Sequence, residues 1–292
     1  MSVSVVGIGT WQFGGEWGKT FEPQEARDIL NVAKDLGINL IDTAECYGDH
    51  TSEALIGQAI VADRDRWILA TKFGHRFQGF LNRSADYSAK GMVSQLEKSL
   101  RALQTDRIDL YQVHGVSQET YEDDELWAAL EKQQRLGKIR AIGVSIGHDP
   151  MPLGRDGVQT VQVAYSRLDL GAEKEVLPLS HKKHLGVLAR VPLANGFLSG
   201  KYHPGQRWSK GDVRNRIEND RIDTMLREVE RIRKEEIPPG TRLATWALSW
   251  CLRHPAVTAV IPGCKSVEQV RCNAAAADQP INQEAHPQAI AF

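Results

Sequence analysis

Four side chains that can exchange protons lie at or just after the ends of three short apolar segments: Asp42, Tyr47, Lys72 and His114. A phenol is a poor acid at neutral pH unless a cation stabilises its phenolate, and a carboxylate keeps such an ammonium charged. A histidine ring can orient a carbonyl oxygen. The four residues therefore suit carbonyl reduction. None of them can supply a hydride, so a nicotinamide or flavin must bind beside them.

The three apolar segments, residues 38–42, 67–72 and 108–114, have the composition of buried strands. Each is short, rich in branched residues and followed by turn or loop residues. If the strands are parallel neighbours, their ends meet at one edge of a sheet and bring the four side chains together. Each residue type alone is more common as a solvated or ion-paired group. Their joint occurrence at successive strand ends indicates an active site.

Strand-like and helix-like segments alternate along the whole chain. The segment 21–36 shows the pattern, with apolar residues at helical spacing, Pro23 in the first turn and Gly37 as a stop. Further helices are expected at 52–62, 87–103, 122–136, near 150, 173–184, 219–234, 241–254 and 267–277. The strand-like segments are 5–9, 38–42, 67–72, 108–114, 139–145, 160–164, 186–191 and 257–261. Eight such units predict an α/β fold, a (β/α)8 TIM barrel forming a single domain over residues 1–292.

Two segments lack clear periodicity. Residues 200–218 follow the seventh strand, are polar and contain several glycines and a proline, so we expect a mobile loop that acts as a lid or ligand clamp. Residues 279–292 are expected to form a C-terminal tail, either packed on the surface or partly disordered.

Composition limits the classes of function. The formal net charge is −1 and no run of basic residues occurs, so we expect neither a nucleic-acid nor a membrane partner. The four cysteines lack paired C-x-x-C spacing, which argues against a metal site and fits reduced thiols. No apolar segment reaches the roughly 18 residues of a membrane span, and the amino terminus lacks a signal-peptide pattern. We expect a cytoplasmic protein.

Several motifs, taken in order, resemble the aldo-keto reductase superfamily, in its bacterial type with short loops. They occupy residues 37–48, 52–57, 70–74, 109–114, 137–145, 192–202 and 261–273. The resemblance implies an NAD(P)H-dependent oxidoreductase that reduces aldehydes or ketones, or catalyses the reverse reaction, with Asp42, Tyr47, Lys72 and His114 as its tetrad. Tyr47 would donate the proton. The resemblance further implies that the substrate is a small carbonyl compound and that the protein is a monomer or a weak homo-oligomer.

The resemblance also implies a set of cofactor contacts, with NADP(H) preferred and NAD(H) possible. At the nicotinamide end they are Gly9, Thr10, Trp11, Asp42, Ser145 and Gln162. On the pyrophosphate side they are Leu193, Gly196, Leu198 and Lys201. At the adenosine end they are Gly263, Ser266, Gln269 and Asn273, with Lys265 reinforcing a 2′-phosphate. No Gly-x-Gly-x-x-Gly follows the first strand, which argues against a Rossmann domain.

Some positions depart from the family pattern. Ile146 stands where an asparagine is common, and Arg190 replaces an aromatic ring, so that either its guanidinium stacks on the nicotinamide or it is a surface arginine. Gly115 replaces a tryptophan and should widen the pocket. Cys46 is either an inert buried thiol or an oxidation site beside Tyr47. The candidate pocket walls are Trp17, His50, Phe73, Phe77 and the loop near Trp208.

Two other functions stay open. One is a slow-turnover NADP(H)-binding regulatory or redox-sensing subunit, which would bind nucleotide but would not depend on Tyr47 for turnover. The other is a metal-dependent barrel hydrolase, although the histidines are scattered along the sequence. Loss of activity in chelator would favour the hydrolase.

Overall fold

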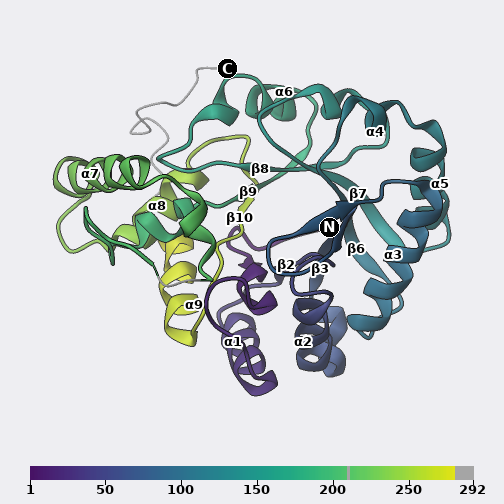
Figure 1. Ribbon diagram of the computed structural model, residues 1–292, viewed down its shortest axis with the longest axis horizontal. Helices are drawn as coiled ribbons and strands as arrows, with labels where there is room; N and C mark the ends of the chain where they lie inside the picture. Colours follow the sequence, from purple (N-terminus) through teal and green to yellow (C-terminus); the bar gives the residue numbers. More distant parts are fainter. Residues whose placement is uncertain (209–210, 280–292) are drawn as a thin grey trace.

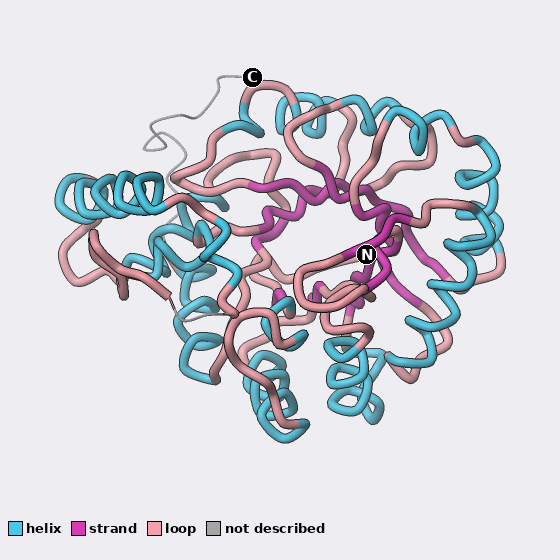
Figure 2. Tube along the Cα trace, in the orientation of Figure 1, coloured by secondary structure: helices cyan, strands magenta, loops and turns pink. Residues whose placement is uncertain are grey.

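The computed structural model describes residues 1–208 and 211–279. Eight strands form one parallel sheet that curls into a ring at the centre of the molecule, and the helices surround it (Figures 1 and 2). In order around the sheet, the strands are β1 (Ile8–Gly9), β2 (Leu40–Asp42), β3 (Ile68–Phe73), β6 (Ile108–His114), β7 (Ile139–Ile146), β8 (Thr160–Ala164), β9 (Gly186–Arg190) and β10 (Ala259–Val260).

Contacts between the first and last strands close the ring. Parallel bridges join Val6 to Val260 and Gly9 to Gly263, and the amide of Gly7 donates to the carbonyl of Val260 at 2.8 Å. Closure leaves no unpaired sheet edge, which an open sheet of this length would have to protect. The predicted (β/α)8 barrel is confirmed, and each predicted strand overlaps the observed one.

The helices form the outer layer. They are α1 (Pro23–Asp35), α2 (Thr51–Ile60), α3 (Ala89–Ala102), α4 (Gln118–Glu122), α5 (Asp124–Arg135), α6 (Val176–Lys182), α7 (Asn219–Glu235), α8 (Leu243–Leu252) and α9 (Val267–Ala274). In α1 a capping box between Glu22 and Glu25 satisfies the first backbone N–H groups. The chain leaves this helix through Gly37, whose φ of 78° suits glycine.

Short 3-10 helices join these elements: η1 (Trp11–Gly14), η2 (Val61–Arg66), η3 (Met151–Gly154), η4 (Gly171–Glu173), η5 (Ala194–Ser199), η6 (Val213–Arg216) and η7 (Ala275–Asp278). No described helix is long and apolar enough to cross a membrane.

The hydrophobic core has two parts. The larger part fills the space between strands and helices, and a small cluster fills the lower inside of the barrel: Leu40, Ala70, Leu110, Ala141, Leu188, Ala259 and Ile261. Val3 packs against this inner cluster and covers it from below. Complete burial of one leucine side chain contributes about 1.5–3 kcal/mol, so this small plug stabilises the barrel beneath the site.

A β-hairpin that no sequence pattern predicts lies in the loop after β3. Strands β4 (His75–Phe77) and β5 (Arg83–Ala85) pair antiparallel through a turn that contains Leu81 at a φ of 53°. The hairpin is polar and lacks the alternation of a half-buried strand, which is why no pattern predicted it.

The segment 200–218 is only partly irregular, because it contains η6 and an antiparallel bridge between Trp17 and Asp212. Residues 209–210 of this segment, and all of the expected tail except Gln279, lie outside the described residues.

Candidate active site

The alternation of side chains along the strands explains why the polar residues meet. Leu40 points into the barrel and belongs to the inner cluster, Ile41 points outward, and Asp42 therefore points inward again, directly above Leu40. The same step of two residues places Lys72 above Ala70 on β3. Further polar side chains on the neighbouring strands follow this rule: Gln112 and His114 on β6, Ser145 on β7 and Arg190 on β9. The apolar cluster inside the barrel thus forms the floor beneath a layer of inward-pointing polar side chains.

Lys72 lies at the centre of this layer with its ammonium fully buried. Its Nζ donates to Asp42 Oδ1 at 3.0 Å, to Asp42 Oδ2 at 2.8 Å and to the carbonyl of Thr43 at 2.7 Å. The phenol oxygen of Tyr47 lies 3.5 Å away. The predicted approach of three members of the tetrad is therefore present, and the buried charge is balanced by a carboxylate.

Two glutamines complete the surroundings of Asp42. The amide of Gln162 donates to Asp42 Oδ1 at 2.7 Å, and that of Gln112 donates to the same oxygen at 3.3 Å. Gln162 was among the expected cofactor contacts, whereas Gln112 was missed. Its inward position two residues before His114 was the signal that could have revealed it. These bonds fix the carboxylate in place below Tyr47.

The phenol of Tyr47 is neutral. Burial raises its pKa well above 10, the charge of Asp42 raises it further, and the guanidinium of Arg190 opposes this shift. The sequence predicts that the Lys72 ammonium stabilises the phenolate once it forms, and that role stays a prediction; burial holds the phenol itself in the protonated form. A protonated phenol is the form that a proton donor needs.

His114 is also neutral. Burial lowers its pKa well below 6.5, and the charge of Lys72 lowers it further. The ring of His75, from the missed hairpin, stacks on that of His114 with centroids 4.6 Å apart, and the hydroxyl of Tyr87 donates to the His114 carbonyl at 2.6 Å. A neutral imidazole has one N–H to offer an acceptor such as a carbonyl oxygen.

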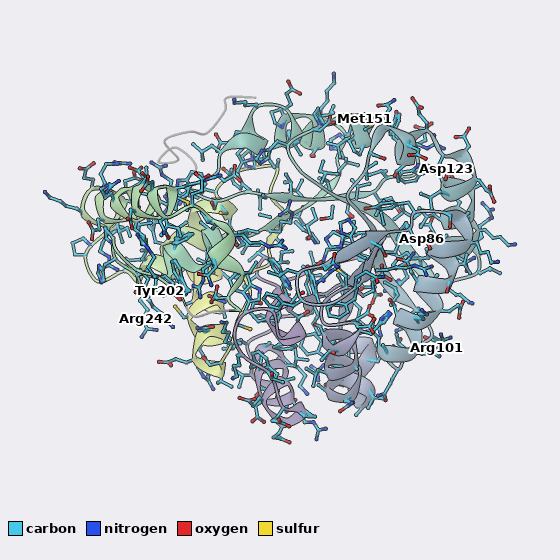
Figure 3. All side chains as sticks on the ribbon, viewed as in Figure 1. Asp86, Arg101, Asp123, Met151, Tyr202 and Arg242 are labelled. Atoms are coloured by element: carbon cyan, nitrogen blue, oxygen red, sulfur yellow. The ribbon has the colours of Figure 1, made fainter. Side chains whose placement is uncertain are left out.

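The tetrad lies at the base of a cavity of about 1040 Å³ at the carboxyl ends of the strands. Most of the expected cofactor contacts line it: Gly9, Thr10, Trp11, Asp42, Ser145, Gln162, Arg190, Leu193, Gly196, Lys201, Gly263, Lys265, Gln269 and Asn273. In the view of Figure 3, two further lining residues, Tyr202 and Arg242, lie on the side of α7 and α8, whereas Asp86, which follows the hairpin, lies on the side of α3.

Two expected contacts do not line this cavity. Leu198 is fully buried in the outer core, where η5 turns its side chain away from the opening. Ser266 is the N-cap of α9, and its hydroxyl accepts from the amide of Gln269 at 3.3 Å. Their contact with the coenzyme stays a prediction, since a backbone group of Leu198 or the hydroxyl of Ser266 is what would have to make it.

The expected pocket walls are partly wrong. Trp17 lines the cavity, but Phe73 is fully buried against Tyr111, with ring centroids 5.0 Å apart. His50 bonds to Glu53 and Phe77 packs under Arg83, so neither lines the cavity. Trp208 packs on Phe197 and Tyr202, and the loop near it does contribute to the wall through Tyr202, Arg214 and Arg216.

The space beside Gly115 is narrower than expected. A Cβ at this position would lie 3.2 Å from Tyr87 Oη and 3.5 Å from His75 Nε2, and its φ of 90° is one that other residues rarely adopt. The segment that follows β3 therefore takes much of the room that a tryptophan side chain would fill.

Cys46 faces the cavity as a protonated thiol. Burial raises its pKa to about 11, and its Sγ lies 3.8 Å from His114 Nδ1. The raised pKa favours the inert thiol over the oxidation site. Arg190 lines the cavity and donates to the carbonyl of Ile146 at 3.1 Å.

The charge of the cavity suits an anionic ligand with several phosphates. Among the described residues, two lining carboxylates, Asp42 and Glu268, face eight lining cations: Arg83, Arg190, Lys201, Arg214, Arg216, Arg233, Arg242 and Lys265. Such an excess of positive charge attracts and holds phosphate groups.

Several residues that line the cavity carry unpaired polar atoms. Within residues 1–208 and 211–279, Asn273 Nδ2, Gln12 Oε1 and Arg190 Nε are buried without a hydrogen-bond partner. Buried polar groups are normally paired, so these atoms are suited to bind a ligand that spans the cavity. An elongated dinucleotide fits both the charge and the polar atoms.

Comparison with known proteins agrees with this geometry. The family model described as "Aldo/keto reductase family" matches residues 5–290. The chain is 34% identical over 286 residues to the uncharacterized oxidoreductase YqkF of Bacillus subtilis, covering 95% of the chain and 88% of that protein. It is 31% identical over 301 residues to the NADH-specific methylglyoxal reductase of Escherichia coli, covering 94% and 90%.

Solved structures are similar over nearly the whole chain. The aldo-keto reductase AKR11C1 from Bacillus halodurans in its holo form superposes with a TM-score of 0.82 at 33% identity, covering 97% of this chain and 90% of that one. An aldo-keto reductase from Klebsiella pneumoniae in complex with NADPH gives a TM-score of 0.71 at 31% identity, covering 97% and 88%.

Proposed function

The chain belongs to the aldo/keto reductase family, and from that premise we propose that it reduces aldehydes and ketones to alcohols or catalyses the reverse oxidation. The observation that carries the proposal is the position of Lys72, whose Nζ contacts both the Asp42 carboxylate and the Tyr47 phenol at the base of the cavity. In this proposal Tyr47 is the proton donor, Lys72 is its supporting cation, and the neutral imidazole of His114 lies on the same side of the cavity.

We further propose NADP(H) as the preferred coenzyme, with NAD(H) as the second candidate. A similar protein from Klebsiella pneumoniae binds NADPH, whereas a relative from Escherichia coli is described as NADH-specific. Support for the phosphate-bearing coenzyme comes from Lys265, which lines the cavity and donates to the carbonyl of Trp17 at 2.6 Å. Lys201 and Arg242 add positive charge to the same cavity.

When bound, the reduced nicotinamide supplies the hydride that carbonyl reduction requires. Asn273 and Gln269 would hold the adenosine end of the coenzyme, Lys201 the phosphates, and Gln162 the carboxamide. The buried Nε of Arg190 and its planar guanidinium would lie against the ring. We expect the backbone at Gly196, whose φ is 89°, to allow close approach of the phosphates.

Tyr47 and His114 do the acid chemistry in this proposal. The Tyr47 hydroxyl and the His114 N–H both donate to the carbonyl oxygen, which gains negative charge as the carbonyl carbon is reduced. Tyr47 then gives up its proton, and the Lys72 ammonium, 3.5 Å from the phenol oxygen, stabilises the phenolate that remains. The Asp42 carboxylate, which accepts from Lys72 at 3.0 and 2.8 Å, holds the ammonium in this position.

The indole of Trp11 limits the access of water to this point. Its ring stacks over that of Tyr47, with centroids 6.0 Å apart and planes at 22°. A dry site strengthens the electrostatic interactions between Lys72 and the phenolate.

The segment 200–218 covers the coenzyme region in this proposal. Lys201, Tyr202, Arg214 and Arg216 from this segment line the cavity, and the bridge between Trp17 and Asp212 ties it to the first loop. We propose that it clamps the coenzyme rather than the substrate, because Lys201 belongs to it and Arg214 lies beside Gly196, and both Lys201 and Gly196 are expected on the pyrophosphate side.

The proposed function is tested by following NADPH and NADH oxidation in absorbance with an activated aromatic aldehyde such as 4-nitrobenzaldehyde. We expect turnover with both coenzymes and a higher kcat/KM with NADPH. Tight coenzyme binding without turnover would instead favour a regulatory or sensing subunit.

A further inference from the structure

A buried carboxylate outside the tetrad ties together the loops around the substrate end of the cavity. Glu16 is 2% exposed and lies in the loop after η1. Its Oε2 accepts from the indole N–H of Trp11 at 2.7 Å, and its Oε1 accepts from the amide of Leu81 at 3.0 Å and from the guanidinium of Arg83 at 2.6 Å. One side chain thus bonds to the first loop and to the β4–β5 hairpin.

The groups that Glu16 holds are walls of the cavity. Trp11, Leu81 and Arg83 all line it, whereas Glu16 itself lies behind them. The indole of Trp11 packs edge-on against Trp17, with centroids 5.1 Å apart, and stacks over Tyr47 on its other side. The position of this indole, and hence the shape of the cavity next to the phenol, depends on its bond to Glu16.

The same network reaches the segment 200–218. Arg216 donates to the carbonyl of Leu81 at 2.9 Å, so the hairpin tip is held on one side by Glu16 and on the other by η6. Leu81 adopts a φ of 53°, a backbone conformation unusual for leucine that the surrounding bonds must maintain. Two loops distant in sequence therefore converge on this hairpin tip.

We propose that Glu16 is a positioning residue that sets the substrate entrance by fixing Trp11 and the hairpin tip around it. This inference rests on the proposed function and identifies a residue that determines which aldehydes the site accepts. The carbonyl end of a substrate is held by Tyr47 and His114, which Glu16 does not touch. Glu16 therefore governs the part of a substrate that extends from the carbonyl toward Trp11 and Leu81.

The test compares a bulky aldehyde, 4-phenylbenzaldehyde, with a small one, propanal, in wild type and Glu16→Gln. Glutamine has nearly the shape of glutamate, but its NH2 group replaces one of the two accepting carboxylate oxygens. That NH2 group would face another hydrogen-bond donor. Because a buried hydrogen bond to a charged group is lost, we expect KM for the bulky aldehyde to rise and its kcat/KM to fall about tenfold. The kcat/KM for propanal should stay within about threefold of the wild-type value. The Kd for NADPH, measured by fluorescence, should stay within about twofold.

Three further variants distinguish a positioning role of Glu16 from a role in the stability of the fold alone. Glu16→Asp keeps the charge and should restore part of the selectivity. Trp11→Phe removes one donor to Glu16 and should shift selectivity in the same direction if Glu16→Gln folds poorly. Glu131→Gln breaks an exposed ion pair with Arg135 on α5 and should leave both aldehydes unaffected.

Two results would overturn the inference. Equal losses for both aldehydes, accompanied by a lower Tm, would mean that Glu16 only stabilises the fold, and unchanged kinetics would mean that the entrance does not depend on it. In either case an active wild type that is silenced by Tyr47→Phe would leave the proposed function intact. A wild type inactive with both aldehydes would remove the proposed function as well.

Discussion

The ammonium of Lys72 donates to both carboxylate oxygens of Asp42, at 3.0 and 2.8 Å, and both side chains are almost fully buried. Neither charge has access to bulk water. Each group therefore depends on the other, because an unpaired charge at this depth is costly.

Removal of one partner should destabilise the protein. Lys72→Met leaves Asp42 buried without its cation, and we expect the free energy of unfolding to fall by about 3–5 kcal/mol, as in other broken buried pairs. The double variant Lys72→Met/Asp42→Asn should recover part of that loss. Guanidinium unfolding of the single and double variants measures both effects, and a simple sum of the two single losses would contradict the coupling.

Glu45 should give the stability an unusual pH dependence. Burial raises its pKa from 4.5 to about 8, and its Oε1 accepts from the amide of Gly74 at 3.1 Å. Between these two values the folded state holds a proton that the unfolded state has lost, so this group's contribution to stability falls as the pH rises. The slope reaches at most about 1.4 kcal/mol per pH unit. Glu45→Gln should remove it in urea unfolding at pH 5 to 8, and an unaltered slope would refute the assignment.

His114 should act in the opposite direction at acidic pH. Its pKa lies well below 6.5 in the folded protein, so below pH 6.5 the unfolded state binds a proton that the folded state does not. The contribution of this group is therefore present above pH 6.5 and lost as the pH falls. We expect His114→Gln to lose less stability than wild type between pH 7 and 5. A parallel loss in both proteins would show that His114 titrates normally.

Arg190 should contribute to coenzyme binding. Among the described residues its Nε has no partner, and its guanidinium lines the cavity from β9, the strand next to that of Gln162. Stacking of a guanidinium on a ring contributes about 0.5–2 kcal/mol, so Arg190→Leu should raise the Kd for NADPH about threefold to thirtyfold. Fluorescence titration measures this Kd, with the exposed Arg135→Gln as a control that should change nothing.

Lys265 should discriminate between the two coenzymes. If it meets a 2′-phosphate, Lys265→Met should lower kcat/KM for NADPH about tenfold while the value for NADH changes less than twofold. Steady-state kinetics with a fixed aldehyde give both values. Equal losses with the two coenzymes would place Lys265 at the pyrophosphate or at the bond to Trp17 instead.

Much of the fold could be predicted from the sequence because the barrel strands and the amphipathic helices have regular apolar patterns. The sequence predicts strands at residues 108–114 and 160–164, and these are the bounds of β6 and β8. The inward position of Asp42 and Lys72 follows from strand alternation once the strand ends are known.

The parts that could not be predicted depend on contacts between distant segments. The β4–β5 hairpin has no apolar pattern of its own and is held by Glu16 and Arg216, which lie far from it in the sequence. The upward shift of the Tyr47 pKa follows from burial, which the sequence does not quantify. Leu198 shows the same limit, since a motif position does not say which way a side chain turns.

The most direct test of the account is the turnover of Tyr47→Phe at saturating NADPH and 4-nitrobenzaldehyde, together with its Kd for NADPH. The variant removes only the hydroxyl that is proposed to donate the proton. We expect kcat to fall by about a hundredfold to ten-thousandfold, typical of a lost general acid, while the Kd changes less than threefold. Turnover near the wild-type rate with unchanged coenzyme binding would contradict the assignment of Tyr47 as the proton donor.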